Sequence, residues 1–251
     1  MADMVSVYMS TPPIARTVAT AVFLCSVGVY TGMLNAEPFI FHYSRLIQFP
    51  PALYLIVTSF LLTGSGMSVL FDTYFIFNYL SQLETGNSKF SKKEDMIWYL
   101  FFLACVILPL NAFFTGGFML LHALLIALCY TATQDQRGMN AHFYIITIPA
   151  QLMPYCLLLV QLLFPNGWES LKIGLTGLVA AHLHDFLTRI YPEFGHGPNL
   201  IPTPRFLSWI MSTPAVQNTV YGQSTAPSAG GGRTGPLPDS WRTKGPGRRL
   251  G

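Results

Sequence analysis

The chain is built mainly from long apolar runs, which short polar or turn-forming segments separate. A helix needs roughly 20 apolar residues to cross about 30 Å of hydrocarbon, and six runs come close to that length. They lie at residues 17–34, 67–83, 96–114, 116–133, 143–164 and 171–189. The pattern therefore predicts an all-α membrane protein, a bundle of six membrane-spanning helices.

Two segments between the first and second runs do not fit a span. Residues 36–51 combine aromatic side chains, which suit the headgroup region, with prolines that prevent one continuous helix. We expect this lumenal insertion to lie on the membrane surface; the alternative is an ordinary lumenal loop. The apolar run 53–63 is too short to cross, and the break at 63–66 indicates an interfacial or re-entrant segment.

Composition agrees with a membrane protein, since 51% of the residues are hydrophobic and only 10% are charged. No basic region precedes the first run, so we expect that run to be kept as a signal anchor. The four cysteines lie inside apolar runs without close-paired spacing, which indicates neither a disulfide framework nor a zinc site. No segment resembles a nucleotide-binding loop, and no metal or cofactor is expected.

The basic residues predict the orientation, because cytoplasmic loops keep an excess of lysine and arginine. If both termini face the cytosol, twelve of the 14 basic residues lie on that side. The other side then holds only Arg45 and Lys172. We therefore expect both termini to be cytosolic.

The composition changes near the end of the last run. The final 61 residues hold nine of the 18 prolines and ten of the 21 glycines. Such a segment cannot bury enough apolar surface to fold alone. We expect a transmembrane domain at 1–190 and a disordered, cytosolic Gly/Pro-rich tail at 191–251, with 204–212 able to lie along the membrane.

One ionisable side chain stands in the middle of the second run. On a helical wheel, Ser65, Ser68 and Tyr79 fall within about 40° of Asp72. An ionisable group in hydrocarbon normally faces protein or a wet cavity. This polar stripe has two interpretations: a hydrophilic groove that opens into the bilayer, or a hydrogen-bonded contact between helices.

The sixth run carries small residues on one face, ending in an acid. Gly174, Gly177, Ala181 and Asp185 lie on that face, which indicates close packing of two helix backbones. His182 and His184 lie about 200° apart on a wheel of 100° per residue, so one helix cannot direct both to one metal ion. His182 lies three residues before Asp185 and is within reach of a hydrogen bond to it.

Two other functions fit parts of the pattern less well. A rhomboid-type intramembrane protease would pair His182 with a serine on the fourth run, where there is none; the nearest hydroxyl before a glycine is Thr115. A small-solute transporter should show related halves with broken helices, and the sequence has no such repeat.

Four segments in order carry a family resemblance: "TSFLLTGSGMSVLFDTYFIFNYLSQLETG" (58–86), "MNAHFY" (139–144), "PAQLMPYCLL" (149–158) and "GLVAAHLHDFLTRIYP" (177–192). Over nearly all of 10–215 the chain resembles the Derlins, rhomboid-like pseudoproteases of the endoplasmic reticulum membrane, and among them a fungal-type member. The resemblance implies a six-span rhomboid-like fold with a lateral gate and without protease activity. It further implies a role in moving misfolded proteins to the cytosol for degradation. The implied partners are membrane lipid, misfolded protein substrates and a membrane ubiquitin ligase complex, but no nucleic acid.

Two positions depart from the family pattern. Derlins usually carry Trp-Arg in the lumenal insertion, where this chain has Tyr54 and Leu55. The loss of a cation that would contact lipid headgroups weakens the expectation that the insertion distorts the bilayer. In the sixth run, Ala181 replaces the second glycine of the family's Gly-x-x-x-Gly-His motif, and we expect the close packing to survive.

The C-terminal "WRTKGPGRRLG" resembles the SHP box, by which several Derlins recruit a hexameric AAA ATPase of the valosin-containing protein type. Gly245, Gly247, Arg249 and Leu250 match its core, with Trp241 as the upstream aromatic residue. The glycines allow an extended backbone to dock, while the leucine and tryptophan offer apolar anchors. The alternative is a basic tail that anionic lipids attract.

Overall fold

The structure is a computed structural model of the chain, and the residues that it describes all belong to one compact unit, Met1–Thr213. It describes residues 6, 8–47, 52–86, 90, 92–134, 136, 138–143, 146–163, 166–195, 200–204, 206–207 and 209. The expected ATPase-binding residues at 241–250 lie outside this set.

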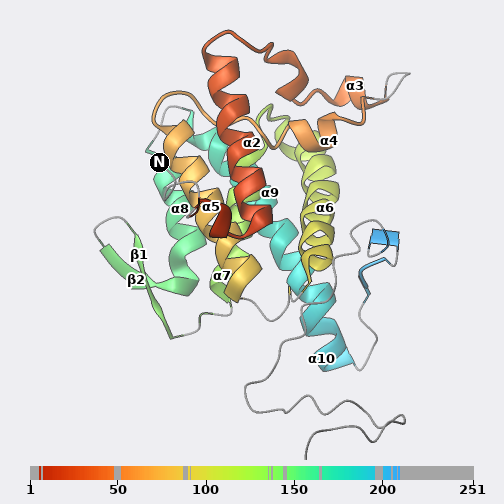
Figure 1. Cartoon of the computed structure of the whole chain (residues 1–251). Helices are drawn as coiled ribbons and strands as arrows, with labels where there is room; N and C mark the ends of the chain where they lie inside the picture. The colour runs from red at the N-terminus through yellow and green to blue at the C-terminus, as the bar shows by residue number, and fades with distance from the viewer. Residues whose placement is uncertain are drawn as a thin grey trace, which may run out of the picture. The chain divides into compact units, whose positions relative to one another are not determined.

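Six principal helices follow the order of the six apolar runs (Figure 1). They are α2 (Pro13–Tyr30), α5 (Ser68–Gly86), α6 (Lys93–Leu110), α7 (Leu121–Gln134), α8 (Met153–Gln161) and α9 (Gly167–Asp185). Among the described residues, two helices are both long and apolar enough to cross a membrane, Pro13–Tyr30 and Lys93–Thr115.

Shorter elements connect the principal helices. Between α2 and α5 lie η1 (Glu37–Phe39), α3 (Tyr43–Ile47) and α4 (Leu55–Thr58), and a π-helical turn, η3 (Asn111–Thr115), extends α6. The strands β1 (Asn140–Phe143) and β2 (Ile146–Pro149) and the 3-10 turn η4 (Ala150–Leu152) precede α8, while η5 (Phe186–Ile190) and α10 (Tyr191–Gly195) continue α9. Figure 1 shows the hairpin at the end of the bundle away from α3 and α4.

Helix α2 begins at Pro13, four residues before the predicted start of the first apolar run. Proline suits the first position of a helix because its φ is already helical and its missing N–H has no partner there. The carboxylate of Glu84 accepts the N–H groups of Ile14 and Ala15, which are among the first amides of α2. This side chain from α5 compensates for the lack of a local cap, since Pro12 cannot supply one.

The fourth and fifth runs were predicted too long at their N-terminal ends. Gly116 has a φ of 63°, which ends the turn before α7, so that α7 begins at Leu121 and not at 116. Phe143 and Ile146–Pro149, predicted as helix, belong to two antiparallel strands in which Asn140 pairs with Pro149. Aromatic and β-branched residues dominate this stretch, and they favour strands. The start of the predicted fifth span is therefore wrong at this hairpin, whereas the all-α class agrees with the described residues, most of which are helical.

Helix α7 forms the centre of the bundle. Its residues from Ala123 to Thr133 are all buried, and α5, α6, α8 and α9 contact it. A helix that is apolar on every side needs apolar surroundings, and here the neighbouring helices provide them. On one side, the hydroxyl of Tyr99 from α6 lies 2.6 Å from that of Thr131, so the buried polar groups in this interface are paired.

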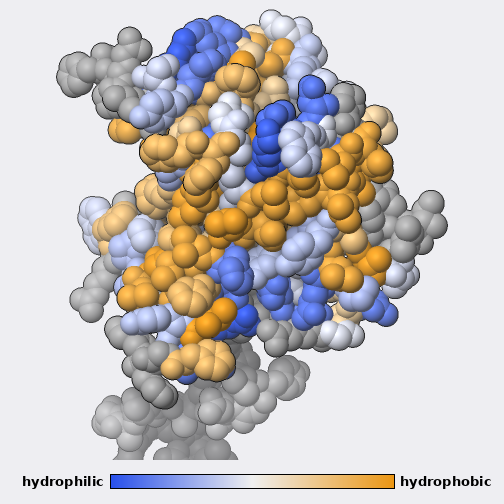
Figure 2. Space-filling view, turned by 180° about the vertical axis from the view of Figure 1, so that it is seen from behind, coloured by the Kyte–Doolittle hydropathy of each residue, from blue (hydrophilic) through white to orange (hydrophobic). Residues whose placement is uncertain are grey.

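The outer surface of the bundle is rich in large apolar side chains. Leu24, Leu70, Tyr74, Phe101, Leu159 and Val179, from five different helices, are among those exposed. Figure 2 shows hydrophobic residues over much of one face. Exposed apolar surface of this extent marks contact with lipid or with other proteins.

Candidate functional site

A cavity of about 780 Å³ lies at the end of the bundle where α2 and α8 end and where α5, α7 and α9 begin. Its lining includes Tyr30 of α2, Ser68, Phe71, Asp72 and Phe75 of α5, Thr115 of η3, His122 and Leu125 of α7, Leu157, Val160 and Gln161 of α8, and Glu169, Ser170 and Ile173 of α9. Polar groups therefore meet apolar walls in one cavity of the size that holds a drug-sized ligand.

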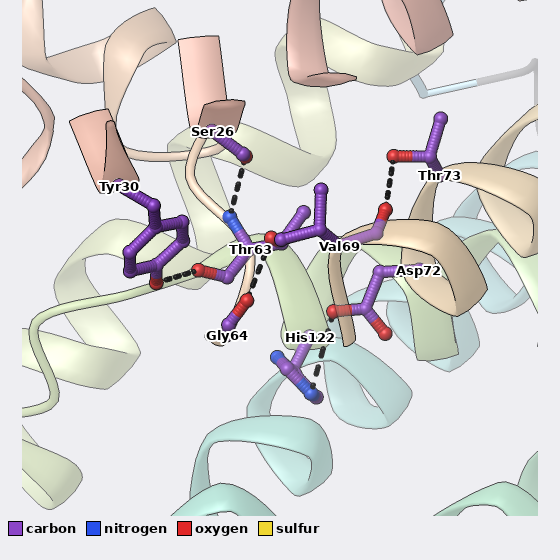
Figure 3. Close-up of polar contacts among 8 residues, drawn as sticks. All are labelled: Ser26, Tyr30, Thr63, Gly64, Val69, Asp72, Thr73 and His122. Atoms are coloured by element: carbon purple, nitrogen blue, oxygen red, sulfur yellow. Dashed lines mark hydrogen bonds and ion pairs between the residues drawn. The ribbon is translucent and has the colours of Figure 1, made fainter. Parts of the chain in front are cut away.

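One wall of the cavity is fixed by hydrogen bonds from α2. The backbone N–H of Thr63 donates to Ser26 Oγ at 3.1 Å, and the hydroxyl of Tyr30 donates to the Thr63 carbonyl at 2.6 Å (Figure 3). Gly66, with a φ of 71°, then turns the chain into α5. These bonds hold Gly64 at the cavity wall, beside the first turn of α5.

Part of the segment 53–63 packs against the bundle. Leu55 has no exposed surface, and Phe60 and Leu62 are also buried. Tyr54, by contrast, is 51% exposed. The two positions where the family pattern has Trp-Arg therefore differ here: one side chain faces outward and the other faces the core.

Asp72 is the most deeply buried acid of the cavity, with 8% of its surface exposed. Its Oδ2 atom lies 3.9 Å from His122 Nε2, which is beyond hydrogen-bond distance (Figure 3). Among the described residues, Oδ2 itself has no hydrogen-bond partner.

Gln161, the last residue of α8, presents a second oxygen of this kind. The residue is 8% exposed, and its Oε1 atom has no hydrogen-bond partner within the described part of the chain. Gly174 lies directly behind it: a Cβ there would be 3.1 Å from Oε1 and 2.6 Å from Leu158 Cδ2. The glycine thus leaves room for α8 to approach α9 at the cavity.

Asn111 organises the loop that closes another side of the cavity. Its Nδ2 donates to the Gly117 carbonyl at 2.7 Å, and the Gly117 N–H donates back to Oδ1 at 3.2 Å. The hydroxyl of Thr115 donates to the same oxygen. Asn111 is fully buried, so this set of bonds holds Thr115, Gly116 and Gly117 in place along the lining.

Three members of the expected polar stripe line the cavity, namely Ser65, Ser68 and Asp72. Tyr79 is not among the lining residues; it is 3% exposed and stacks on Phe75 with ring centroids 6.1 Å apart. Tyr79 lies seven residues beyond Asp72, roughly 10 Å further along α5, where the core is closely packed. The expectation that Tyr79 lines the groove is therefore corrected: Tyr79 belongs to the core.

The small-residue face of α9 lies against α7. A Cβ on Gly177 would fall 1.9 Å from the carbonyl oxygen of Ala123, so no larger residue fits without moving a backbone. Gly174 and Ala181 are also buried, and a Cβ on Gly174 would lie nearest to Leu158 of α8. Asp185, also buried, forms an ion pair with Arg189 at 2.7 Å.

His182 has a different partner from the expected Asp185. Its Nδ1 atom lies 2.8 Å from the hydroxyl of Tyr130, near the C-terminal end of α7. Thr115 lies before Leu121, where that helix begins. From Leu121 to Tyr130 the helix already extends roughly 13 Å along its axis. The histidine and the threonine of the protease alternative therefore lie at opposite ends of α7.

The described residues contain no group of three or more His, Cys, Asp or Glu side chains that could hold a metal ion. The cysteines at 25, 105, 129 and 156 are all free thiols.

Sequence reasoning missed Asn111, His122 and Gln161. Each was visible as a polar residue in or beside an apolar run, which is the same signal that singled out Asp72. Their arrangement was not visible, because it depends on how η3, α7 and α8 pack: His122 and Gln161 line the cavity, and Asn111 holds the loop at its edge.

The comparisons with known proteins all point to one family. The model of the Der1-like family matches residues 11–205. The chain is 26% identical to Derlin-1 of Arabidopsis thaliana over 210 residues, which is 82% of this chain and 76% of that protein. It is 23% identical to the probable derlin-2 homolog of Dictyostelium discoideum over 211 residues, 81% of each chain.

A human relative is similar over a shorter region: Derlin-1 of Homo sapiens is 28% identical over 155 residues, 59% of this chain and 58% of that protein. The family match spans the cavity and every principal helix. The chain therefore belongs to the Der1-like family, the Derlins, membrane proteins that are linked to endoplasmic reticulum-associated degradation.

Proposed function

We propose that this protein aids the retrotranslocation of misfolded proteins from the endoplasmic reticulum to the cytosol, through a thinned and hydrated lateral groove. The groove includes the cavity lined by Ser65, Ser68 and Asp72. The observation that carries the proposal is the pair of buried oxygens without hydrogen-bond partners, Asp72 Oδ2 and Gln161 Oε1, in a cavity large enough for a polypeptide segment. Six spans and two cytosolic termini complete the proposed topology.

One short helix at the outer surface supports a thinned membrane. Helix α8 has nine residues, and its Leu159 is exposed. At 1.5 Å per residue this helix is roughly 13 Å long, against about 30 Å of hydrocarbon. A bilayer adapts to a short apolar helix by becoming thinner around it. A thinner and wetter path lowers the barrier, because each unsatisfied peptide group costs several kcal/mol in hydrocarbon.

The segment between α2 and α5 suits the lumenal surface of the membrane. It consists of short helices, and Tyr43, Leu53 and Tyr54 are exposed on it. Tyrosine is favoured at the interface because its ring is apolar and its hydroxyl is polar. We infer that this insertion rests in the headgroup region beside the groove.

We infer that the protein breaks no peptide bond and acts as a rhomboid-like pseudoprotease. The sequence of α7 contains no serine, and Thr115 and His182 lie at opposite ends of that helix. The Thr115 hydroxyl already donates to Asn111, so it has no base positioned to take its proton.

Energy for extraction would come from a partner. We propose that the C-terminal residues Trp241, Gly245, Gly247, Arg249 and Leu250 recruit a hexameric AAA ATPase, and that a membrane ubiquitin ligase complex marks the substrates. A glycine-rich segment with apolar anchors suits docking in an extended form.

Degradation of two misfolded reporters, one lumenal and one membrane-anchored, tests the proposal in cells that lack this protein. We expect both reporters to accumulate, and the intact chain to restore their turnover. A chain cut before Trp241 should bind reporter without restoring turnover, which separates the groove from the recruitment of the ATPase. Normal turnover without the protein would contradict the proposal.

A further inference from the structure

The described lining of the cavity carries two acidic side chains and no lysine or arginine. The acidic residues are Asp72 and Glu169. Glu169 is already paired, since Lys172 Nζ lies 2.9 Å from its Oε1. Asp72 is the remaining buried acid of the cavity, and His122 is too far from it for a hydrogen bond.

Two acceptor atoms of the cavity therefore lack a hydrogen-bond donor among the described residues. Asp72 Oδ2 and Gln161 Oε1 come from different helices, are each in residues only 8% exposed, and line the same cavity. A buried acceptor without a hydrogen-bond partner is unfavourable, and His122, with Nε2 3.9 Å from Oδ2, is a charge partner of the carboxylate only when it is protonated. An ammonium group offers three donors and a guanidinium five, together with a permanent positive charge.

The remaining walls fit the rest of a polypeptide. Phe71, Phe75, Leu125, Leu157 and Val160 line the cavity around the acceptors. A volume of about 780 Å³ exceeds what one basic side chain fills, so apolar neighbours of that side chain can pack there as well. This mixture matches a membrane segment in which one basic residue stands among apolar ones.

We propose that the cavity binds the lysine or arginine side chain of a polypeptide segment that enters from the lipid, with Asp72 as its counter-ion and Gln161 as a second acceptor. The inference rests on the proposed function and adds the chemistry of the substrate. A basic side chain is costly in hydrocarbon. A site that compensates the charge of this side chain within the membrane therefore selects the membrane segments that are least stable in lipid.

The test uses the full-length protein in phosphatidylcholine nanodiscs, because choline has no N–H donor. A photo-reactive benzophenone amino acid replaces Phe71, a lining residue, or, as a control, Leu70, which is 58% exposed and outside the lining. Single-span peptides that differ only in one central residue, lysine, arginine, glutamine, glutamate or leucine, are then cross-linked at equal concentration.

We expect cross-linking at position 71 to be about tenfold higher for the lysine and arginine peptides than for the leucine peptide. Asp72→Asn should abolish this preference, and Gln161→Leu should reduce it several-fold. Tyr74→Phe, on the exposed side of the same helix, should leave it unchanged. The peptide series in the unsubstituted background gives a result even if a variant fails to fold.

Equal cross-linking of all peptides at position 71, or an unchanged preference in a folded Asp72→Asn protein, would overturn the inference while the proposed groove stands. No cross-linking at position 71 with any peptide would overturn both. A repeat in phosphatidylethanolamine separates the two sources of an ammonium group. If the preference disappears there, the lipid headgroup is the ligand and the polypeptide assignment is wrong.

Discussion

The carboxylate of Glu84, near the end of α5, accepts the backbone N–H of Ile14 at 3.0 Å, at the start of α2. The same oxygen accepts the N–H of Ala15, also at 3.0 Å. Helix N-termini carry unpaired N–H groups and a partial positive charge, and a carboxylate compensates both. A side chain 70 residues away in sequence thus performs the capping that a neighbouring serine or aspartate usually provides.

Glu84→Ala should therefore lower the stability of the protein by about 1–2 kcal/mol, the usual range for loss of a helix cap. The thermal unfolding midpoint in detergent is the measurement. Glu193→Ala, an exposed acid in α10, is the matched control and should have little effect. Equal midpoints for the two variants would show that the cap contributes no stability.

Gly177→Ala should be far more damaging than Gly174→Ala. At Gly177 the new methyl group meets the carbonyl oxygen of Ala123 at 1.9 Å, so the backbones of α7 and α9 must separate. At Gly174 it first meets the Leu158 side chain, whose far end can move. Overpacking of a core costs about 1–3 kcal/mol or more. Folded yield and unfolding midpoint compare the two variants, and a reversed order would refute the packing argument.

Asn111→Ala should loosen the loop at the cavity. The substitution removes both bonds to Gly117 and the acceptor of the Thr115 hydroxyl. Each net hydrogen bond contributes about 1 kcal/mol, so the expected loss of stability is about 2–3 kcal/mol. Hydrogen exchange of the amides at 115–119 measures it, and protection equal to that of the original protein would contradict the assigned role.

The pair of Glu37 and Arg45 gives a dependence on pH. The hydrogen bond and charge of Arg45 lower the pKa of Glu37 below its usual value of 4.5. A carboxyl with a lowered pKa stabilises the folded state above its unfolded pKa, and this contribution is lost as the pH falls through the folded pKa. The effect should be small because the pair is exposed.

We expect the unfolding midpoint of the original protein to fall more steeply below pH 4.5 than that of Glu37→Gln. Arg45→Gln should behave like Glu37→Gln, since either change removes the pair. Parallel pH profiles for all three proteins would show that the interaction does not contribute to folding.

The apolar runs predicted the order of the principal helices, because a helix must be largely apolar whether it is buried in the bundle or contacts lipid. Ends were harder to predict. Gly116 and the hairpin at 140–149 depend on backbone conformation and β propensity, which a hydropathy window averages away. Only the residues that α5 contributes to the cavity were predicted. The hydrogen bonds that fix the cavity wall, such as that from Thr63 to Ser26, join residues far apart in sequence.

The two bonds to Thr63 constrain how the bundle can rearrange. Its N–H and its carbonyl are both held by α2, from Ser26 and from Tyr30. A small displacement of the chain before α5 must break both bonds together or carry the first helix with it. The cavity wall can therefore change its backbone conformation only after Thr63, at Gly64 and Gly66. Helix α2 and Thr63 move together as one rigid unit.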